Sequence, residues 1–279
     1  MIERSDAVNW STLRTIRISP LHYLDALAHP REDTEALLLG RLTHCMVYEP
    51  TLVAERYVRE PRFNRAMKDE TARAHGLDGG RESAALWALE HVHHDVVPVD
   101  LWSRAEAMAA SLHADPIAAP MITGGYAEQS ITWVDASTGI DCRGRIDHVN
   151  GCLSDLKTTR TIEPRLFAAT AARYGYHAQL AWYLDGLVAC GVAVDPTPSL
   201  IVVENERPHD VLVLDLDDAT LAAGRAVYRG CLERLAECRE RDAWPGVGGG
   251  SRSTLALPAW AVPVPDEQVT LGGESIYGD

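Results

Sequence analysis

The dipeptide Asn150-Gly151 is the strongest folding signal in this sequence, because it separates two segments with strand-like composition. Asn-Gly supplies the positive φ angles that a two-residue hairpin turn requires. We therefore predict antiparallel strands at residues 140–149 and 152–158. Alternation of apolar and polar residues over 127–134 predicts a strand before them, so the three strands form a meander.

Helices are predicted on both sides of this meander. Ser19-Pro20 combines a capping residue with proline at the first helical position, which predicts a helix that ends near His29. Apolar spacing and breakers predict further helices at residues 34–48, 81–94, 99–114, 163–172, 176–190 and 217–241, and strands at 199–205 and 210–215. Residues 59–80 are predicted to be a loop.

This order of elements predicts one α/β (α+β) domain over residues 1–279, with a mixed central sheet flanked by helices. A length of 279 residues is near the upper limit for a single core. We expect a helical N-terminal part at 1–120, a core at 121–242 and an irregular tail, rich in proline and glycine, at 243–279.

Composition restricts the cellular setting. No run of about 18 apolar residues could span a membrane, and the N-terminus lacks a signal-peptide apolar stretch, so we expect a cytoplasmic protein. The six cysteines include no CxxC pair, which favours reduced thiols over disulfides, zinc or an iron–sulfur cluster.

The net charge of −14 argues against nucleic-acid binding when it is taken as an average. The segment 140–176 differs, because it holds six basic residues and four acidic ones. The basic residues are Arg143, Arg145, Lys157, Arg160, Arg165 and Arg173, and the acidic ones are Asp141, Asp147, Asp155 and Glu163. If two of these acids hold metal, a basic DNA channel with an acidic exterior is possible.

The tripeptide Asp155-Leu156-Lys157 is the first candidate for a catalytic site. Residues two apart on a strand point the same way, so Asp155 and Lys157 share a face. Asp147 lies on the preceding strand, where pairing across the turn would bring it close to Asp155. Two adjacent carboxylates repel unless a cation such as Mg²⁺ or Mn²⁺ lies between them. A lysine beside that ion could orient water for phosphodiester hydrolysis; a surface ion pair of Asp147 and Lys157 is the structural alternative.

Four motifs occur in the order found in one nuclease class. They are GxxxH at residues 40–44, GxxD at 144–147, DxK at 155–157 and QxxxY at 179–183. Together they resemble the RecB-type branch of the PD-(D/E)XK nucleases, which have a restriction-endonuclease-like core. Residues 18–23, 175–179 and 257–260 (Leu257 to Trp260) further resemble the exonuclease VIII family of prophage recombination exonucleases.

The resemblance implies an activity and a set of partners. That family degrades linear double-stranded DNA from its ends, 5′ to 3′, with Mg²⁺, and leaves 3′ single strands for an annealing protein. It often assembles as a homo-oligomeric ring.

The resemblance also implies roles for individual residues. Asp147, Asp155, the Leu156 carbonyl and His44 would hold metal, and Lys157 would position the attacking water. Glu128 matches an acidic position and is a candidate ligand for a second metal. Gln179 and Tyr183 would contact DNA phosphate or brace the site. The candidates for further DNA contacts are Arg143, Arg145, Arg160 and Arg173.

Alternatives remain open at this point. His44 could be structural, Gln179 a solvated polar residue, Tyr183 a core residue and Glu128 an outward-facing charge. A CRISPR-associated end-processing nuclease shares the four motifs but carries clustered cysteines for an iron–sulfur cluster. An inactive DNA-binding module on a nuclease fold would lack the intact Asp and Lys set. A restriction-like endonuclease would have a separate recognition domain.

Overall fold

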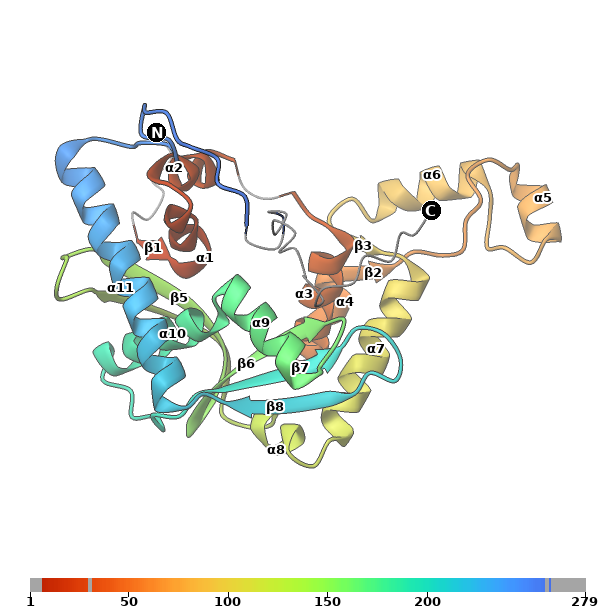
Figure 1. The fold of residues 1–279 in the computed structure, drawn as a ribbon. Coiled ribbons are helices and arrows are strands. Elements are labelled where there is room, and N and C mark those ends of the chain that lie inside the picture. The colour runs from red at the N-terminus through yellow and green to blue at the C-terminus, as the bar shows by residue number, and fades with distance from the viewer. Residues whose placement is uncertain (1–6, 30–31, 259–260, 262–279) are drawn as a thin grey trace, which may run out of the picture.

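A mixed β-sheet forms the centre of the molecule. The structure is a computed structural model that describes residues 7–29, 32–258 and 261 (Figure 1). Within those residues the sheet has six strands in the order β1-β5-β6-β7-β8, with β4 paired to β5. The strands are β1 (Val8–Asn9), β4 (Tyr126–Val134), β5 (Asp141–Asn150), β6 (Cys152–Thr159), β7 (Ser199–Glu204) and β8 (Val211–Asp215).

The predicted meander is confirmed, but its turn is tighter than expected. Strands β4, β5 and β6 are antiparallel neighbours, and β6 continues into a parallel pair with β7. Asn150 pairs with Cys152 and only Gly151 takes a positive φ, of 71°. The two-residue turn was wrong because Asn150 stays in the strand, where its side-chain amide donates to the Thr123 carbonyl over 3.1 Å.

Helices cover both faces of the sheet. One face packs against α10 (Tyr176–Ala189), α11 (Asp218–Arg241) and the N-terminal helices α1 (Trp10–Leu13) and α2 (Pro20–Ala28). The other face packs against α3 (Glu35–Tyr48), α7 (Val99–Ala114) and α8 (Ala118–Ile122). The predicted mixed α/β fold is therefore confirmed.

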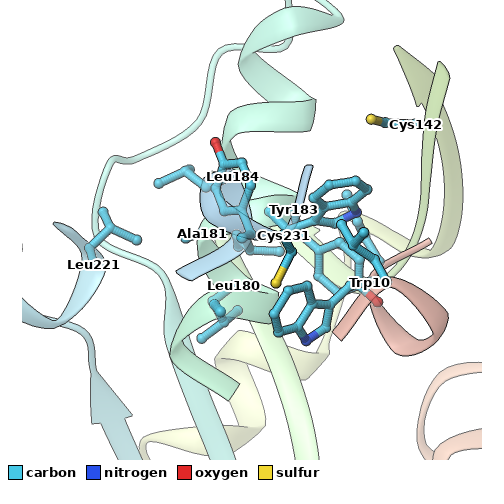
Figure 2. Close-up of a cluster of buried hydrophobic side chains, with 14 of the residues drawn as sticks. Trp10, Cys142, Leu180, Ala181, Tyr183, Leu184, Leu221 and Cys231 are labelled. Carbon is cyan, nitrogen blue, oxygen red and sulfur yellow. The ribbon is translucent and has the colours of Figure 1, made fainter. Parts of the chain in front are cut away.

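Side chains of β7 alternate between the two cores. Leu200 and Val202 enter the core under α10, while Ile201 and Val203 enter the core under α3. Residues 199–203 are all buried, as expected for a strand covered on both faces. Figure 2 shows the α10 side, where Leu180 and Leu184 pack near Leu221 and Trp10.

Local capping explains the helix starts that the sequence predicted. The Ser19 hydroxyl accepts from the His22 amide, and Pro20 occupies the first turn of α2. The Thr34 hydroxyl accepts from the Leu37 amide at the start of α3. Helix α9 (Pro164–Tyr174) ends at Gly175, whose φ of 73° lets the chain reverse into α10.

The segment before α7 departs from the prediction. Within the predicted loop lies α5 (Asp69–Ala74), and β2 (Tyr57–Arg59) pairs in parallel with β3 (Asp95–Val97). Helix α6 (Arg81–Glu90) ends four residues before the predicted 94. The Asp69 carboxylate ties α5 to α6 by accepting from the amides of Gly80 and Ser83, contacts that periodicity does not encode. Figure 1 shows α5 and α6 projecting away from the sheet.

Six other short elements of the described residues were not predicted: β1, α1, a 3₁₀ turn at Arg14–Arg17, a 3₁₀ turn at Pro50–Leu52, α4 (Val53–Arg56) and α8. Of the motif Leu257 to Trp260, Ala259 and Trp260 lie outside the described residues. The division into parts at 120 and 242 stays a prediction. Across the described residues, no helix is long and apolar enough to cross a membrane.

Candidate active site

Three predicted ligands from three elements converge at one point. His44 on α3, Glu128 on β4 and Asp147 on β5 each offer a ligand atom, and these atoms lie within 4.8 Å of one another. The His44 Nδ1 is 3.5 Å from Asp147 Oδ2 and 3.9 Å from Glu128 Oε1. One imidazole and two carboxylates, all partly buried, make a donor set that suits a divalent cation.

Glu128 and Asp147 lie directly opposite each other on neighbouring strands. The pairs Ala127–His148 and Gln129–Ile146 flank them in register, and Glu128 takes a φ of 52°. Facing like charges destabilise a strand pair, and positive φ at a non-glycine residue is strained. A cation bound between the two carboxylates would offset both effects.

The strands β5 and β6 separate at the site. Their pairing ends at His148 and Ser154, one residue before Asp147 and Asp155 would face each other. The Leu156 amide instead donates to Asp147 Oδ2 over 2.8 Å, and the Leu156 carbonyl accepts from His44 Nε2 over 3.0 Å. The Nε2 atom of His44 is thus bonded to this carbonyl, and Nδ1 is the ring atom that faces Asp147 and Glu128.

Asp155 lies beneath the group of three and is turned toward Lys157. Its side chain is 1% exposed and forms an ion pair with the Lys157 ammonium, while neither carboxylate oxygen accepts a hydrogen bond of good geometry. Burial, reinforced by the charge of Asp147, raises the pKa of Asp155 to about 6. The pKa of Lys157 is also raised, because Asp155 and Asp147 outweigh the effect of burial, so its amine stays protonated.

Helix α10 closes the site from the other face of the sheet. Gln179 Nε2 donates to the Tyr183 hydroxyl over 3.1 Å, and the Lys157 ammonium lies 5.1 Å from the centre of the Tyr176 ring. Tyr183 packs on Gly144, where an added Cβ would come within 2.9 Å of the ring. The glycine of GxxD and the tyrosine of QxxxY are therefore packing partners.

Comparison with known proteins places this arrangement in a family. A family model described as "PDDEXK-like domain of unknown function (DUF3799)" matches residues 9–254. The chain belongs to this PDDEXK-like family. The predicted superfamily is confirmed, and its core motifs all fall within the matched residues.

One solved structure shares the fold of this PDDEXK-like protein. A structure named "Putative exonuclease", from Eubacterium rectale, matches with a TM-score of 0.58 and 12% identity over 91% of each chain. At that identity the likeness concerns the fold alone. A second structure, named SSO0001, is 14% identical over 79% of this chain and 85% of its own, with a TM-score of 0.27 that is too low to use. No curated protein matches the sequence.

The PDDEXK-like motifs line one large cleft. The cleft has a volume of about 1580 Å³, and its floor includes His44, Glu128, Asp147, Lys157 and Gln179. All four arginines predicted to contact DNA, which are Arg143, Arg145, Arg160 and Arg173, also line it. Asp155 is not part of the lining, because it lies below Lys157. The cleft thus combines candidate metal ligands with a basic wall.

The predicted DNA-contacting residues differ in their surroundings. Arg145 Nε lies 2.5 Å from Glu128 Oε2, so this guanidinium is engaged at the metal-ligand cluster. The Arg173 guanidinium lies 5.8 Å from the centre of the Tyr174 ring. Tyr183 is buried with its hydroxyl beside Gln179, and burial raises the pKa of Tyr183, so the phenol stays neutral. Their roles toward DNA stay predictions.

Two site residues escaped the sequence analysis. Tyr48 is one turn after His44 on α3, and its buried hydroxyl has no hydrogen-bond partner among the described residues. Burial, followed by the charge of Asp147, raises the pKa of Tyr48 well above its usual value. Glu49 follows it and pairs with Arg145. The four-residue spacing of Gly40, His44 and Tyr48 was the available signal for Tyr48.

Proposed function

We propose that this chain is a Mg²⁺-dependent deoxyribonuclease that hydrolyses phosphodiester bonds at the His44, Glu128 and Asp147 cluster. The observation that carries the proposal is the convergence of these three residues beside the buried Asp155–Lys157 pair, in a cleft with a basic wall. Carboxylate, carbonyl and imidazole ligands suit Mg²⁺ or Mn²⁺.

The ligands would be His44, Asp147, Asp155 and the Leu156 carbonyl, with Glu128 at the edge of the site. When bound, a divalent ion would polarise the scissile phosphate and lower the pKa of a coordinated water. Asp155 would have to be ionised to hold the ion. Burial raises its pKa to about 6, and the neighbouring Lys157 ammonium acts in the opposite direction by favouring the ionised form.

Lys157 acts as a charged donor rather than as a base. Its raised pKa keeps the ammonium protonated, so it can orient the attacking water and stabilise negative charge on the phosphate in the transition state. Tyr176 lies against the ammonium and limits the directions in which it can point. Tyr183, which accepts a hydrogen bond from Gln179 on α10, also contributes to the raised pKa of Lys157.

The arginines of the cleft would hold the DNA backbone. Arg143, Arg160 and Arg173 are exposed along the cleft wall, where phosphate contacts carry affinity without sequence preference. Such contacts release counterions, so binding should weaken steeply as salt rises. A basic cleft in a chain of net charge −14 confines the DNA to that wall.

The finer activity rests on the resemblance to the exonuclease VIII family. We infer that the substrate is linear double-stranded DNA, degraded from its ends in the 5′ to 3′ direction, with a 3′ single strand as product. A single-strand annealing protein as partner, a ring-shaped homo-oligomer and a cytoplasmic location belong to the same proposal. The role in phage-type recombination follows from that product.

The test compares linear with covalently closed circular duplex DNA, each with Mg²⁺ and with chelator. The proposal expects the wild-type protein to degrade the linear duplex when Mg²⁺ is present, and to leave the circular duplex intact. No degradation is expected with chelator or with the Lys157→Ala variant. Labelling each end in turn then gives the polarity. The matched control is Arg229→Ala, an exposed substitution on α11 away from the cleft, which should cut as wild type does.

Other outcomes assign other functions. Cutting of the circle would indicate an endonuclease, and binding without cutting would indicate an inactive DNA-binding module. An iron–sulfur nuclease of the CRISPR-associated kind would purify as a coloured protein. In the structure the cysteines are dispersed, with Cys190 exposed and Cys231 and Cys238 buried along α11.

A further inference from the structure

A row of alternating charges leads from the surface to the candidate metal site. It runs from Arg56 on α4 to Glu49 at the end of α3, then to Arg145 on β5 and to Glu128 on β4. Each member contacts the next within ion-pair distance. The row ends at Glu128 Oε1, which faces His44.

Arg145 is the centre of this row. Its Nε lies 2.5 Å from Glu128 Oε2, and its Nη2 lies 3.3 Å from Glu49 Oε2. The two carboxylate oxygens of Glu128 therefore have different neighbours: Oε2 pairs with Arg145, and Oε1 faces His44. One oxygen of Glu128 remains for a metal.

Glu49 is fixed in turn. Arg56 donates to both of its oxygens, over 2.5 Å from Nη1 and 3.1 Å from Nη2. A bidentate pair of this kind restricts the carboxylate more than a single bond does. Glu49 therefore holds Arg145 in place beside Glu128, although the Arg145 side chain is 58% exposed.

The Arg145 guanidinium occupies a position between two carboxylates where a metal cation could otherwise bind. Glu128 and Glu49 flank it, and without it their oxygens would form a second acidic pair next to Asp147. An arginine keeps its charge at any pH at which proteins fold, so it cannot vacate this place by losing a proton.

We propose that Arg145 acts as a built-in cation that neutralises Glu128 and Glu49 and so limits the cleft to one divalent ion per chain. This inference rests on the proposed function. It gives Arg145 a positioning role in place of the predicted DNA contact, and it removes the second metal that the resemblance suggested for Glu128.

The test is the number of Mn²⁺ ions bound per chain, measured on the full chain by titration calorimetry and by the electron paramagnetic resonance signal of free Mn²⁺. Wild type should bind one ion. Arg145→Gln should bind two, because no cation would then lie between Glu128 Oε2 and Glu49, although Arg56 still pairs with Glu49. Arg145→Lys, which keeps the charge, should bind one.

The matched control is Arg143→Gln, two residues earlier on the same strand and on the same cleft, which should still bind one ion. If a thermal melt shows that the Arg145→Gln variant does not fold, Arg145→Met is used in its place, because methionine keeps the apolar part of the arginine side chain. Two ions in wild type, or one ion in the neutral variants, would overturn the inference and leave the nuclease proposal standing. No ion in wild type would overturn both.

Discussion

Helix α10 lies beside two polar clusters whose carboxylates differ in their hydrogen bonding: one contains the partly buried Asp185 and the other the buried Asp155. At its C-terminal half, Asp185 accepts from Arg225 Nη2 over 2.8 Å and from the Tyr228 hydroxyl over 2.5 Å. Arg225 Nε adds bonds of 3.1 and 3.0 Å to the two oxygens. Every contact is made within the fold, so this cluster is complete without a ligand.

The cluster at the other end of α10 is incomplete. Asp155 is almost fully buried, yet neither of its oxygens accepts a hydrogen bond of good geometry. Glu128 and Asp147 face each other across two strands, and Glu128 has a strained φ. The Tyr48 hydroxyl nearby is also without a partner among the described residues.

The difference distinguishes a structural cluster from a functional one. Buried polar groups in folded proteins are nearly always paired, so the unpaired Asp155 oxygens and Tyr48 hydroxyl beside the candidate ligands support the proposal that a cation binds there. The Asp185 cluster stabilises the contact between α10 and α11. In the proposed function, the His44, Glu128 and Asp147 cluster would hold its ligand atoms in place for a cation.

The largest expected difference between the clusters is in catalysis. Lys157→Ala should lower the rate of DNA hydrolysis by about 10³-fold, because it removes the charge that stabilises the phosphate in the transition state. Arg225→Ala, the corresponding removal of a cation from the Asp185 cluster, should leave the rate within about threefold. Initial rates on linear duplex check both, and equal losses would remove the distinction.

Metal binding should stabilise the fold through one cluster only. At a Mg²⁺ concentration of about 100 times the dissociation constant, the free energy of unfolding should rise by about 2.7 kcal/mol relative to chelator. Asp147→Asn should abolish this increase, while Asp185→Asn should retain it. Denaturant unfolding with and without Mg²⁺ measures the increase, and its persistence in Asp147→Asn would place the ion elsewhere.

The structural cluster should matter for stability instead. Asp185→Ala should lower the free energy of unfolding by about 2 kcal/mol, because it leaves Arg225 and the half-buried Tyr228 hydroxyl without their acceptor. The measurement is urea unfolding in the presence of chelator, with Glu233→Ala, an exposed position on α11, as control. A change within experimental error would show that solvent replaces these contacts.

The smallest expected effect is the pH dependence of the metal stabilisation. The pKa of Asp155 is raised to about 6 by burial, so the metal-free fold binds this proton more tightly than the unfolded chain does. The contribution of Asp155 to metal-free stability is therefore greatest at low pH and falls as the pH rises through about 6. Cation binding requires the ionised form and has the opposite dependence.

The increase in unfolding free energy caused by Mg²⁺ should accordingly grow between pH 5 and pH 7, by at most about 1.4 kcal/mol per pH unit for each ligand that must lose a proton. These ligands are Asp155 and His44, whose pKa is raised because the charges of Asp147 and Glu128 outweigh the effect of burial. Thermal melts across this range, with and without Mg²⁺, test it. Asp185→Asn should behave as wild type. An increase that stays constant with pH would mean that Asp155 does not take part in holding the ion.

Local sequence information was sufficient for much of the fold and for the motif residues. The bounds of α7 match the prediction, because Pro98 and Pro116 flank the helix closely and its apolar spacing lies within it. His44, Asp147 and Lys157 were found for a similar reason, since fixed spacing placed them on one helix and two strands of a hairpin. The structure brings these three side chains into one cleft.

What the sequence did not predict depends on contacts between distant residues. The strained backbone of Glu128 follows from its register with Asp147, and the engagement of Arg145 follows from Glu49, which is 96 residues away. The burial of Asp155 depends on helices that close both faces of the sheet. The paired short strands β2 and β3 lack any periodic pattern of their own.

The central claim is that a divalent ion completes the open cluster. It is tested most directly by anomalous X-ray scattering at the manganese edge from crystals of the protein grown with Mn²⁺. The account predicts an anomalous peak bounded by His44, Asp147 and the Leu156 carbonyl, with Arg145 still beside Glu128. A peak elsewhere, or no peak in a well-ordered cleft, would contradict it.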